Sequence, residues 1–507
     1  MLGLFGKKSG HPLADIRSAQ QLLDELPKND TLKALQELTS WTEAMREHAE
    51  FQVDHEAAVM RLIEETARPL ERKLVRDYFA ASSLPSFQEN RLWMALNEFY
   101  TQLSESYLKI LARYRDGEKG SSAIKPSLPL ISVRGIRAMT GRLKCASARY
   151  MLIDPVIWKH LAEFYTHADE QRYADESVQL YSGAPANTSV RHEFTGAVAW
   201  YVSSASTLNR FHLHLAERLS SCLCKYMTAG KQCEPDCLYG FDLSDPKPPL
   251  RVTKEIVSQP GLLFIGVANV KAYVEQLLNE LEKNTVPDEL NLGGLYDAEI
   301  VRDVLSHLAR NLTVPPPMRR TVRHSLKVSL NIANGFSSIM EHSGVSLNFG
   351  GDSSALWEVE DISTGGFHCI VPSSYPSSLA IGSLIGLRPE KLDYWGVGIV
   401  RRMSRDQQNN LHIGVEILSN RVTGVGLGEQ KSEVEQHALW LSGPEDGKEE
   451  VRLLMSSDTF STNRSLHAHF ENKSYLLMPL SLLEKGDDFD LARYRKIEKD
   501  TSPDQAV

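Results

Sequence analysis

The sequence predicts a multidomain α + β protein: a helical N-terminal region, then a small antiparallel β-barrel, then a short β-rich C-terminal segment. The chain has 507 residues, and at about 150 residues per domain this length corresponds to roughly three domains. The hydrophobic period is that of helices up to about residue 310 and that of strands beyond it. Three consecutive prolines, at 315–317, separate the two patterns and favour an extended connection.

Composition and charge exclude several classes of protein. Lys and Arg number 56 and Asp and Glu number 65, which gives a formal charge of −9. This mild acidity argues against broad nucleic-acid binding, for which a basic balance is expected. The hydrophobic fraction of 42% and the charged fraction of 24% are typical of a soluble globular protein. Six cysteines are too few for a disulfide scaffold, and no apolar run is long enough to span a bilayer. We therefore expect a cytoplasmic protein with no membrane span.

Residues 1–312 have the pattern of an all-helical packing module. Within 89–115, hydrophobic residues recur at spacings of three and four, and 267–281 repeat the pattern after a Pro-Gly pair. A further long helical pattern covers 190–227, and a stretch rich in Pro and Asp at 238–252 predicts a loop with one strand. No fixed-period repeat indicates a solenoid. We interpret the region as an output or partner-docking module.

Residues 317–420 have the pattern of a small antiparallel barrel. Hydrophobic residues alternate with polar or small ones in several short runs, which turn signals separate. The alternating positions are Leu326, Val328, Leu330 and Ile332; Ala355, Trp357 and Val359; Phe367, Cys369 and Val371; Trp395, Val397 and Ile399; and Leu411, Ile413, Val415 and Ile417. A glycine-rich stretch at 424–428 predicts a linker. Residues 432–498 then form a β-rich segment, with strand-like runs at 451–455 and 475–480.

Catalytic signatures are absent from the sequence. It contains no Walker A spacing, no His-Glu-x-x-His and no Gly-x-Ser-x-Gly. The glycines at 424–428 lack the third glycine and the strand–helix context of a dinucleotide fingerprint. We therefore expect neither an enzyme nor a bound cofactor. An active site in the helical region is a further reading that no motif supports.

Four cysteines lie within sixteen residues, at Cys222, Cys224, Cys233 and Cys237. Four thiolates could hold zinc. However, Cys-x-Cys followed by Cys-x-x-x-Cys differs from the common paired Cys-x-x-Cys spacing. The first pair also falls in a helical pattern, where residues two apart point to different faces. We interpret all four as ordinary reduced cysteines, and zinc binding stays open as the alternative.

The most informative constellation follows the prolines. It combines an Arg-x-x-x-Arg pattern with Asp-x-Ser-x-x-Gly, which begins 38 residues later (361 − 323) between two alternating strands. The candidate ligand-binding residues are Arg319, Arg320, Arg323, Asp361, Ser363 and Gly366. Arg320 lies between the two spaced arginines, and we expect it to matter least.

Neither half of this constellation is specific alone. Arg68 and Arg72 have the same spacing as the first pattern, and so do Arg401 and Arg405. A lone Asp-x-Ser-x-x-Gly is usually a turn in which Asp and Ser bond to backbone N–H groups. In a window of thirty residues of average composition it occurs by chance about once or twice in a hundred trials. The conjunction of the two patterns is therefore the stronger signal.

Together the two patterns fit a ligand with two negative charges and flat aromatic faces. Guanidinium groups bind phosphates in bidentate fashion and also stack on, or donate to, a guanine edge. A carboxylate accepts hydrogen bonds from guanine N–H groups, a hydroxyl serves as donor or acceptor, and glycine permits close approach of the backbone.

Residues 317–419 resemble a PilZ domain, the bacterial receptor module for cyclic di-GMP. The resemblance depends on Arg319-x-x-x-Arg323, on Asp361-x-Ser363-x-x-Gly366, and on the final strand with Gly414-Val415-Glu416-Ile417-Leu418. It implies a six-stranded barrel whose arginines clamp the dinucleotide, often as an intercalated dimer. It covers about a fifth of the chain and leaves the helical region without a family.

The sequence contains no Gly-Gly-Asp-Glu-Phe or Glu-Ala-Leu signature of the enzymes that make or degrade this messenger. The resemblance therefore implies a receptor that relays cyclic di-GMP to a protein partner through the helical region. The alternative is a structural adaptor whose barrel is a protein-interaction platform with solvated arginines. Nucleotide affinity with and without the two spaced arginines discriminates between them. Because these arginines directly follow the prolines, a ligand that gathers them would also reposition the connection between the two halves.

Overall fold

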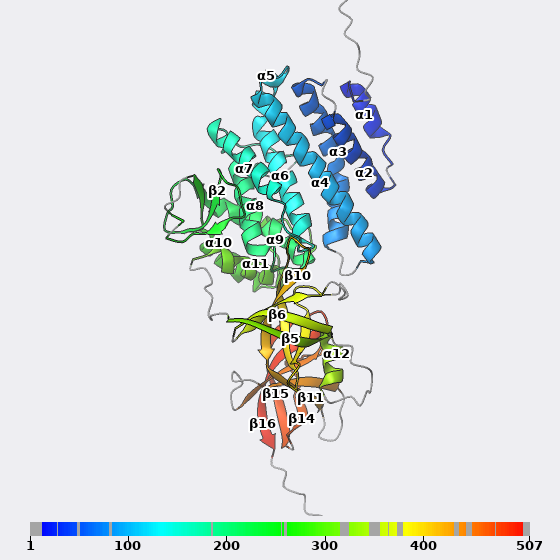
Figure 1. Ribbon diagram of the computed structural model, residues 1–507, viewed down its shortest axis with the longest axis vertical. Coiled ribbons are helices and arrows are strands. Elements are labelled where there is room, and N and C mark those ends of the chain that lie inside the picture. The colour runs from blue at the N-terminus through cyan, green and yellow to red at the C-terminus, as the bar shows by residue number, and fades with distance from the viewer. Residues whose placement is uncertain are drawn as a thin grey trace, which may run out of the picture. The chain divides into compact units, whose positions relative to one another are not determined.

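The computed structural model describes residues 13–27, 29–47, 51–80, 84–183, 186–254, 256–257, 261–314, 324–343, 355–363, 365–372, 379–429, 436–442, 449–471 and 473–499. The chain forms two compact units, Met1–Met318 and Arg319–Val507. The first, the helical unit, is drawn in blue to green in Figure 1, and the second, the β unit, in yellow-green to red. Among the described residues, no helix combines the length and the hydropathy needed to cross a membrane.

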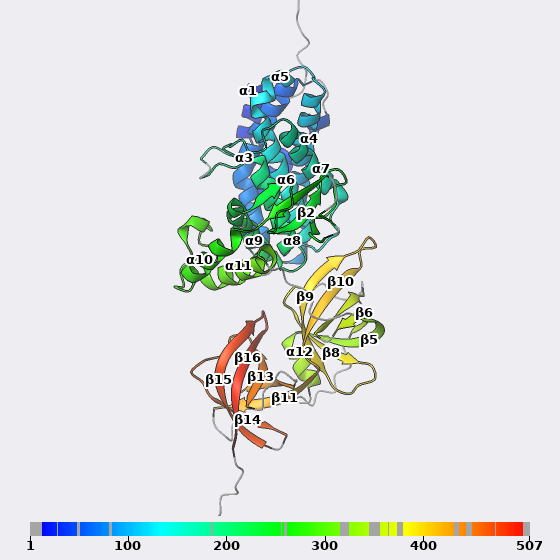
Figure 2. The same ribbon diagram turned by 90° about the vertical axis from the view of Figure 1, so that its left-hand side faces the viewer.

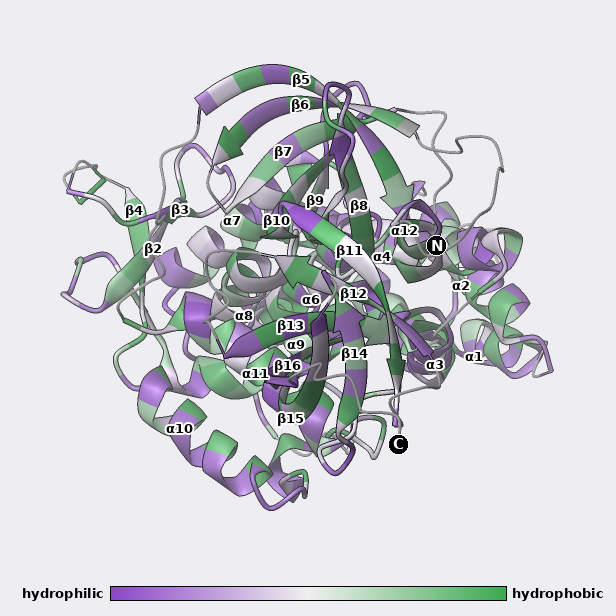
Figure 3. Ribbon diagram, turned by 90° about the horizontal axis from the view of Figure 1, so that it is seen from below, coloured by the Kyte–Doolittle hydropathy of each residue, from purple (hydrophilic) through white to green (hydrophobic). Residues whose placement is uncertain are grey.

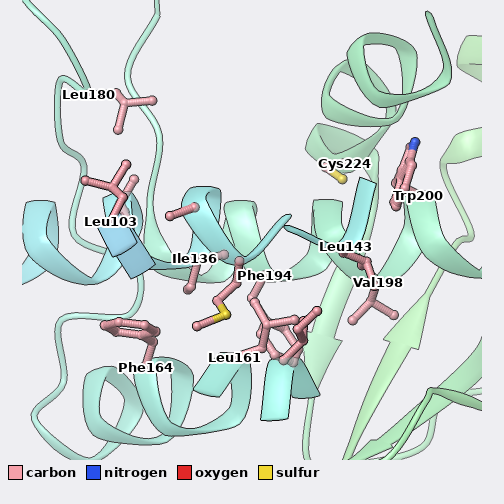
Figure 4. Close-up of a cluster of buried hydrophobic side chains, with 14 of the residues drawn as sticks. Leu103, Ile136, Leu143, Leu161, Phe164, Leu180, Phe194, Val198, Trp200 and Cys224 are labelled. Carbon is pink, nitrogen blue, oxygen red and sulfur yellow. The ribbon is translucent and has the colours of Figure 1, made fainter. Parts of the chain in front are cut away.

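The helical unit packs its helices around one continuous hydrophobic core. The helices are α1 (Ile16–Asp24), α2 (Thr31–Glu47), α3 (Val53–Phe79), α4 (Ser86–Arg115), α5 (Ser121–Ile124), α6 (Leu128–Ser147), α7 (Pro155–Glu170), α8 (Val190–Ser204), α9 (Arg210–Leu223), α10 (Val270–Leu281) and α11 (Ala298–Leu312), with short 3₁₀ turns η1 (Lys125–Ser127), η2 (Cys224–Tyr226) and η3 (Asp288–Leu290). Figure 4 shows part of this core, where Ile136, Leu161 and Phe194 converge from α6, α7 and α8.

The predicted helical pattern at 190–227 is divided between two helices. α8 ends at Ser204, and Asn209 begins α9 by accepting a hydrogen bond from the backbone N–H of His212 through its side chain. Such an N-cap satisfies one of the donors left free at a helix start, so it fixes the break between the two helices. The hydrophobic period alone does not reveal this break.

The first unit is mainly helical, as predicted, and differs from an all-helical module by one small sheet. The strands are β1 (Thr228–Gly230), β2 (Cys237–Asp242), β3 (Leu250–Arg251) and β4 (Leu262–Gly266), in the order β1-β4-β2-β3. Where the sequence predicted a loop with one strand, at 238–252, the structure has most of β2 and all of β3. β4 is buried along its whole length, and β2 at all but its last residue. Strands buried on both faces read as continuous apolar runs without alternation, which explains why the sequence pattern missed this sheet.

The predicted six-stranded antiparallel barrel is confirmed. Its strands are β5 (His324–Asn334), β6 (Ala355–Ser363), β7 (Gly366–Val371), β8 (Leu384–Pro389), β9 (Gly396–Arg405) and β10 (Leu411–Ser419), and the closed order is β10-β7-β6-β5-β8-β9. We call this barrel the first barrel. Figure 3 shows hydrophobic and hydrophilic residues alternating along β5 and β6. A short helix, α12 (Gly335–His342), follows β5 and packs against β8. Neither β8 nor α12 was expected from the sequence.

The β-rich C-terminal segment closes into a second six-stranded barrel. Its strands are β11 (Arg421–Gly428), β12 (Gln436–Ser442), β13 (Glu450–Ser456), β14 (Leu466–Phe470), β15 (Lys473–Lys485) and β16 (Phe489–Lys499), in the closed order β11-β12-β13-β16-β15-β14. The prediction of a linker at 424–428 is wrong, because these residues belong to β11. Val425 and Leu427 face the barrel interior, while Gly424 and Gly426 occupy the alternate positions. The residues do alternate with a period of two, but glycines at the alternate positions made the segment look like a linker.

The two barrels share a hydrophobic cluster. Trp395 and Val397 of the first barrel pack in one cluster with Leu439 and Phe489 of the second. A hydrogen bond joins them as well: the backbone N–H of Phe336, in α12, donates to the side-chain oxygen Oδ2 of Asp488 at 2.6 Å. Figure 2 shows both barrels beside one another. The β unit is therefore one packed body and not two domains on a flexible linker.

Candidate nucleotide-binding site

The Asp-x-Ser-x-x-Gly motif forms the tip of the β6–β7 hairpin. Ser363 ends β6 and lies opposite Gly366, which begins β7. The hydroxyl of Ser363 donates to the carbonyl oxygen of Gly366 at 3.1 Å. The two strands therefore meet at this tip, and Ser363 bonds across it to the start of β7. The structure brings together all three predicted residues of this motif.

Position 366 requires glycine because the backbone of a neighbouring strand approaches it closely. A Cβ at this position would lie 2.2 Å from the carbonyl oxygen of Val415, in the neighbouring strand β10. Gly366 pairs with Glu416 in the ladder between β7 and β10, so a side chain here would push the two strands apart. The glycine of the motif therefore has a structural role that does not involve a ligand.

Asp361 carries a half-buried carboxylate beside this tip. It pairs with Ser325 of β5 on one side and with His368 of β7 on the other. Its side chain is 27% exposed, and Oδ2 lies 3.9 Å from Nδ1 of His368. A carboxylate in this position is fixed by two neighbouring strands and still accessible, which is what an acceptor for ligand N–H groups requires.

The predicted arginines Arg319, Arg320 and Arg323 lie outside the described residues. The strand that follows them is described. β5 begins at His324, directly after Arg323 in the sequence, and His324 and Ser325 pair with Ile362 and Asp361 of β6. The described end of β5 that is nearest to the arginines in sequence therefore lies against the motif hairpin.

Two other arginine pairs of the same spacing lie among the described residues, where Arg401, Arg405 and Arg68 have protein partners. Arg401 contacts Glu416 at 2.7 Å and Glu484 at 2.5 Å, and so connects the first barrel to the second. Arg405 donates to the carbonyl oxygen of Asn409 at 3.0 Å. Arg68 and Arg72 lie on α3, where Arg68 contacts Glu71 at 2.7 Å. Spacing alone therefore does not identify a ligand site in this chain.

The four cysteines do not form a ligand cluster within the described part of the chain. Cys222 and Cys224 lie at the end of α9 and in η2, whereas Cys233 and Cys237 pack in a separate small cluster near β2. Burial raises the pKa of Cys222 and Cys224, and that of Cys237 to about 11. The separation of the two pairs favours the interpretation as ordinary reduced cysteines.

The structure also brings together three side chains that the sequence analysis did not single out: Glu360, His368 and His412. Nδ1 of His368 lies 2.9 Å from Oε2 of Glu360, and Nδ1 of His412 lies 3.5 Å from the same oxygen. Nε2 of His412 lies 3.0 Å from Asp406, and this hydrogen bond is the main cause that lowers the pKa of Asp406, to about 2. The sequence signal, two histidines on strands with alternating hydrophobicity, was too weak to find this group.

The helical unit contains a polar cavity of about 1040 Å³, lined by residues of α3, α4, α6, α8 and α9. Charged groups on its wall pair with one another. Arg137 contacts Glu193 at 3.2 Å, and Lys144 contacts Glu217. Burial raises the pKa of Glu217, but Lys144 and His214 lower it further, so the carboxyl has a pKa well below its ordinary value. These pairs offset part of the charge on the cavity wall, and we assign the cavity no ligand.

Comparison with known families finds a match in each of the two units. Residues 353–423 match the family model described as "Cyclic-di-GMP receptor FimW, middle PilZ domain", which covers the motif hairpin and begins after the arginines. Residues 17–232 match the model described as "Cyclic-di-GMP receptor FimW, N-terminal domain". The expectation that the helical region has no recognisable family is thereby corrected. No curated protein matches the chain. Residues 17–232 and 353–423 therefore belong to the family of cyclic di-GMP receptors that carry a PilZ domain.

Proposed function

We propose that this protein is a cytoplasmic receptor that binds cyclic di-GMP at the rim of its first barrel and relays binding to a protein partner, without turning the nucleotide over. The observation that carries the proposal is the β6–β7 hairpin, where Asp361, Ser363 and Gly366 meet beside the start of β5. The described cysteines are all unpaired, in keeping with a reducing compartment.

The proposed roles follow from the chemistry of each group. Arg319 and Arg323 supply cations for the phosphates and for the guanine edge, since a guanidinium binds both in bidentate fashion. Asp361 accepts hydrogen bonds from guanine N–H groups. Ser363 bonds to the backbone of the turn, so its contribution is to hold the turn in the shape that presents Asp361. This division assigns direct contacts to Arg319, Arg323 and Asp361 and a positioning role to Ser363.

Isothermal titration of the full chain with cyclic di-GMP tests the proposal. We expect saturable binding that the double variant Arg319→Ala/Arg323→Ala weakens by at least about 1.5–3 kcal/mol, the scale of one hydrogen bond to a charged group. Arg405→Ala is the matched control: this arginine belongs to a pair of the same spacing, but it bonds to the turn at Asn409. Equal affinity in the double variant and the control would overturn the assignment of the two arginines to the site. No saturable binding to the unaltered chain would favour the adaptor function, in which the barrel is only an interaction platform.

Relay to a partner requires that ligand binding at the barrel change the conformation or dynamics of the helical unit. Hydrogen exchange of the full chain tests this step. Added cyclic di-GMP is expected to slow exchange at 318–322 and to change it at some surface of the helical unit. Protection confined to the β unit, with no change before Pro315, would leave a binding module without an intramolecular switch.

A further inference from the structure

Three neighbouring strands of the first barrel present a histidine, a second histidine and a carboxylate to one point. Glu360 is in β6, His368 in β7 and His412 in β10, and these strands are adjacent in the closed order. His412 pairs with Ile370, two residues from His368, so the two histidines are diagonal neighbours on one face. A register shift in β6 between Val359 and Asp361 marks the position of Glu360. One potential ligand atom from each residue lies within 4.8 Å of the others.

The distances match those between the ligands of a tetrahedral metal ion. Bonds of about 2.0–2.1 Å place two ligand atoms of a tetrahedron about 3.3 Å apart. The two imidazole nitrogens lie 2.9 Å and 3.5 Å from the same oxygen of Glu360. Two histidines and one glutamate are a known zinc ligand set that leaves one position open. The side chains of His368 and His412 are 27% and 17% exposed, so an ion from solution can reach them.

A second carboxylate orients one of the histidines. Nε2 of His412 bonds to Oδ2 of Asp406 at 3.0 Å, which directs Nδ1 toward Glu360. Asp406 is itself held by the turn, because its Oδ1 accepts from the backbone N–H groups of Gln408 and Asn410 at 2.9 and 2.8 Å. A carboxylate that receives the far N–H of a ligating histidine fixes the tautomer and the ring orientation, and it is a regular companion of metal sites.

We propose that Glu360, His368 and His412 bind one Zn²⁺ ion on the outer face of the first barrel, with Asp406 as the positioning residue for His412. The fourth position is open to water or to an oxygen of a ligand. The site adjoins the proposed nucleotide site, since His368 also faces Asp361. A bound zinc ion would fix the position of the His368 ring. Zinc binding itself does not depend on whether the protein binds cyclic di-GMP.

Titration of the chelator-treated full chain with Zn²⁺, followed by calorimetry, tests the proposal. We expect His368→Ala and His412→Ala each to weaken zinc binding by more than about 100-fold, and Asp406→Asn by about 10- to 100-fold, as for an outer-shell partner. Glu360→Gln removes the charged ligand at nearly the same size and should also weaken binding. His437→Ala, an exposed histidine of β12 in the second barrel, is the matched control and should leave the affinity unchanged.

Cobalt(II) as a probe separates this site from the cysteines. Histidine and carboxylate ligands give visible d–d bands without the thiolate-to-metal charge transfer that cysteine ligands add. Unchanged zinc affinity in the double variant His368→Ala/His412→Ala, or a cobalt spectrum with thiolate charge transfer, would assign the metal to the cysteines and overturn the proposal. If the chain binds no zinc at all, the proposal is wrong and the three side chains form only surface ion pairs. Thermal unfolding confirms that each variant is folded, which is expected because neither histidine belongs to the barrel interior.

Discussion

The two barrels have the same number of strands and are both closed, but their surfaces differ. The first barrel presents the motif hairpin and the cluster of Glu360, His368 and His412. In the second barrel, one strand, β15, exposes several hydrophobic residues: Met478 is 42% exposed, Leu480 39% and Leu482 37%. The comparison teaches that barrel closure supplies a frame and that chemistry resides in the few side chains at a rim or on an outer face.

The interiors of the barrels are alike in kind. Trp357 and Phe367 are buried in the first barrel, and Trp440 and Tyr494 in the second. Branched aliphatic residues are buried as well, among them Val359 and Val371 in the first barrel and Val425 and Leu453 in the second. A substitution that affects ligand binding should therefore act at the surface features that differ, and a substitution in either interior should act on stability alone.

The largest expected effect comes from Gly366→Ala. Because its Cβ would lie 2.2 Å from the carbonyl oxygen of Val415, β7 and β10 must separate. Because the clash is with backbone and not with a flexible side chain, we expect a loss in the free energy of unfolding at or above the upper end of the usual cost of overpacking, about 3 kcal/mol, together with loss of cyclic di-GMP binding. Gly414→Ala in β10 is the matched control, since its Cβ would make an ordinary contact of 3.4 Å with Arg402. Denaturant unfolding measures both variants, and equal stabilities would contradict the close approach.

The next largest effect is expected for Asp361→Ala, and it concerns affinity. A lost hydrogen bond to a charged group corresponds to about 1.5–3 kcal/mol, or roughly 10- to 150-fold in the dissociation constant. The barrel should stay folded, because this side chain lies at a strand end and is not part of the interior. Asp393→Ala, in the exposed turn before β9, serves as control. Calorimetry measures the affinity of both variants for cyclic di-GMP. Equal affinities would show that Asp361 does not contact the ligand and has only a structural role in the turn.

A smaller effect is expected for Ser363→Ala. The variant loses the hydrogen bond to the carbonyl oxygen of Gly366, which contributes about 0.5–1.5 kcal/mol to stability. Affinity should fall by no more than this amount if Ser363 only positions the turn. A far larger loss of affinity than of stability would show that the hydroxyl contacts the ligand directly. Calorimetry and thermal unfolding on the same sample separate the two effects.

The smallest effect is expected where the two barrels meet. Arg401 contacts Glu484 of β15 through both terminal nitrogens, at 2.5 and 2.6 Å. Because the Arg401 side chain is 37% exposed, solvent screens the pair, and we expect a coupling energy of only about 0.2–1 kcal/mol. A double-mutant cycle with Arg401→Met and Glu484→Gln measures it at low and high salt. Coupling that is independent of salt would contradict a screened surface pair.

Much of the β unit could be predicted because its strands alternate in the ordinary way. The runs from Leu330 to Ile332 and from Phe367 to Val371 have one buried and one outer face, so a period of two is visible in the sequence. The same reasoning failed at β11, where glycines fill the outer positions, and at β2 and β4, where burial on both faces removes the alternation. The limit is physical, because hydrophobic alternation appears in a sequence only where one face of a strand is buried and carries large apolar side chains while the other face does not.

The candidate site was predictable only in part, for a different reason. Asp361, Ser363 and Gly366 are close in sequence and form one hairpin, so a local motif describes them. Glu360, His368 and His412 are separated by 8 and 44 residues (368 − 360 and 412 − 368). They meet because β10 pairs with β7 when the barrel closes, and this long-range pairing is not encoded in any short run of residues.

The connection between the barrels has a mechanical consequence. One residue, Asn420, separates β10 from β11, and the hydroxyl of Ser419 lies 2.6 Å and 2.7 Å from the carbonyl oxygens of Arg421 and Ser442. The connection is one residue long, its neighbour Ser419 is hydrogen-bonded to the second barrel, and the shared hydrophobic cluster packs beside it. It therefore leaves little freedom for the two strands to move independently. We therefore expect a shift of β10 to displace β11 as well, so that the second barrel follows a movement of the first without a hinge between them.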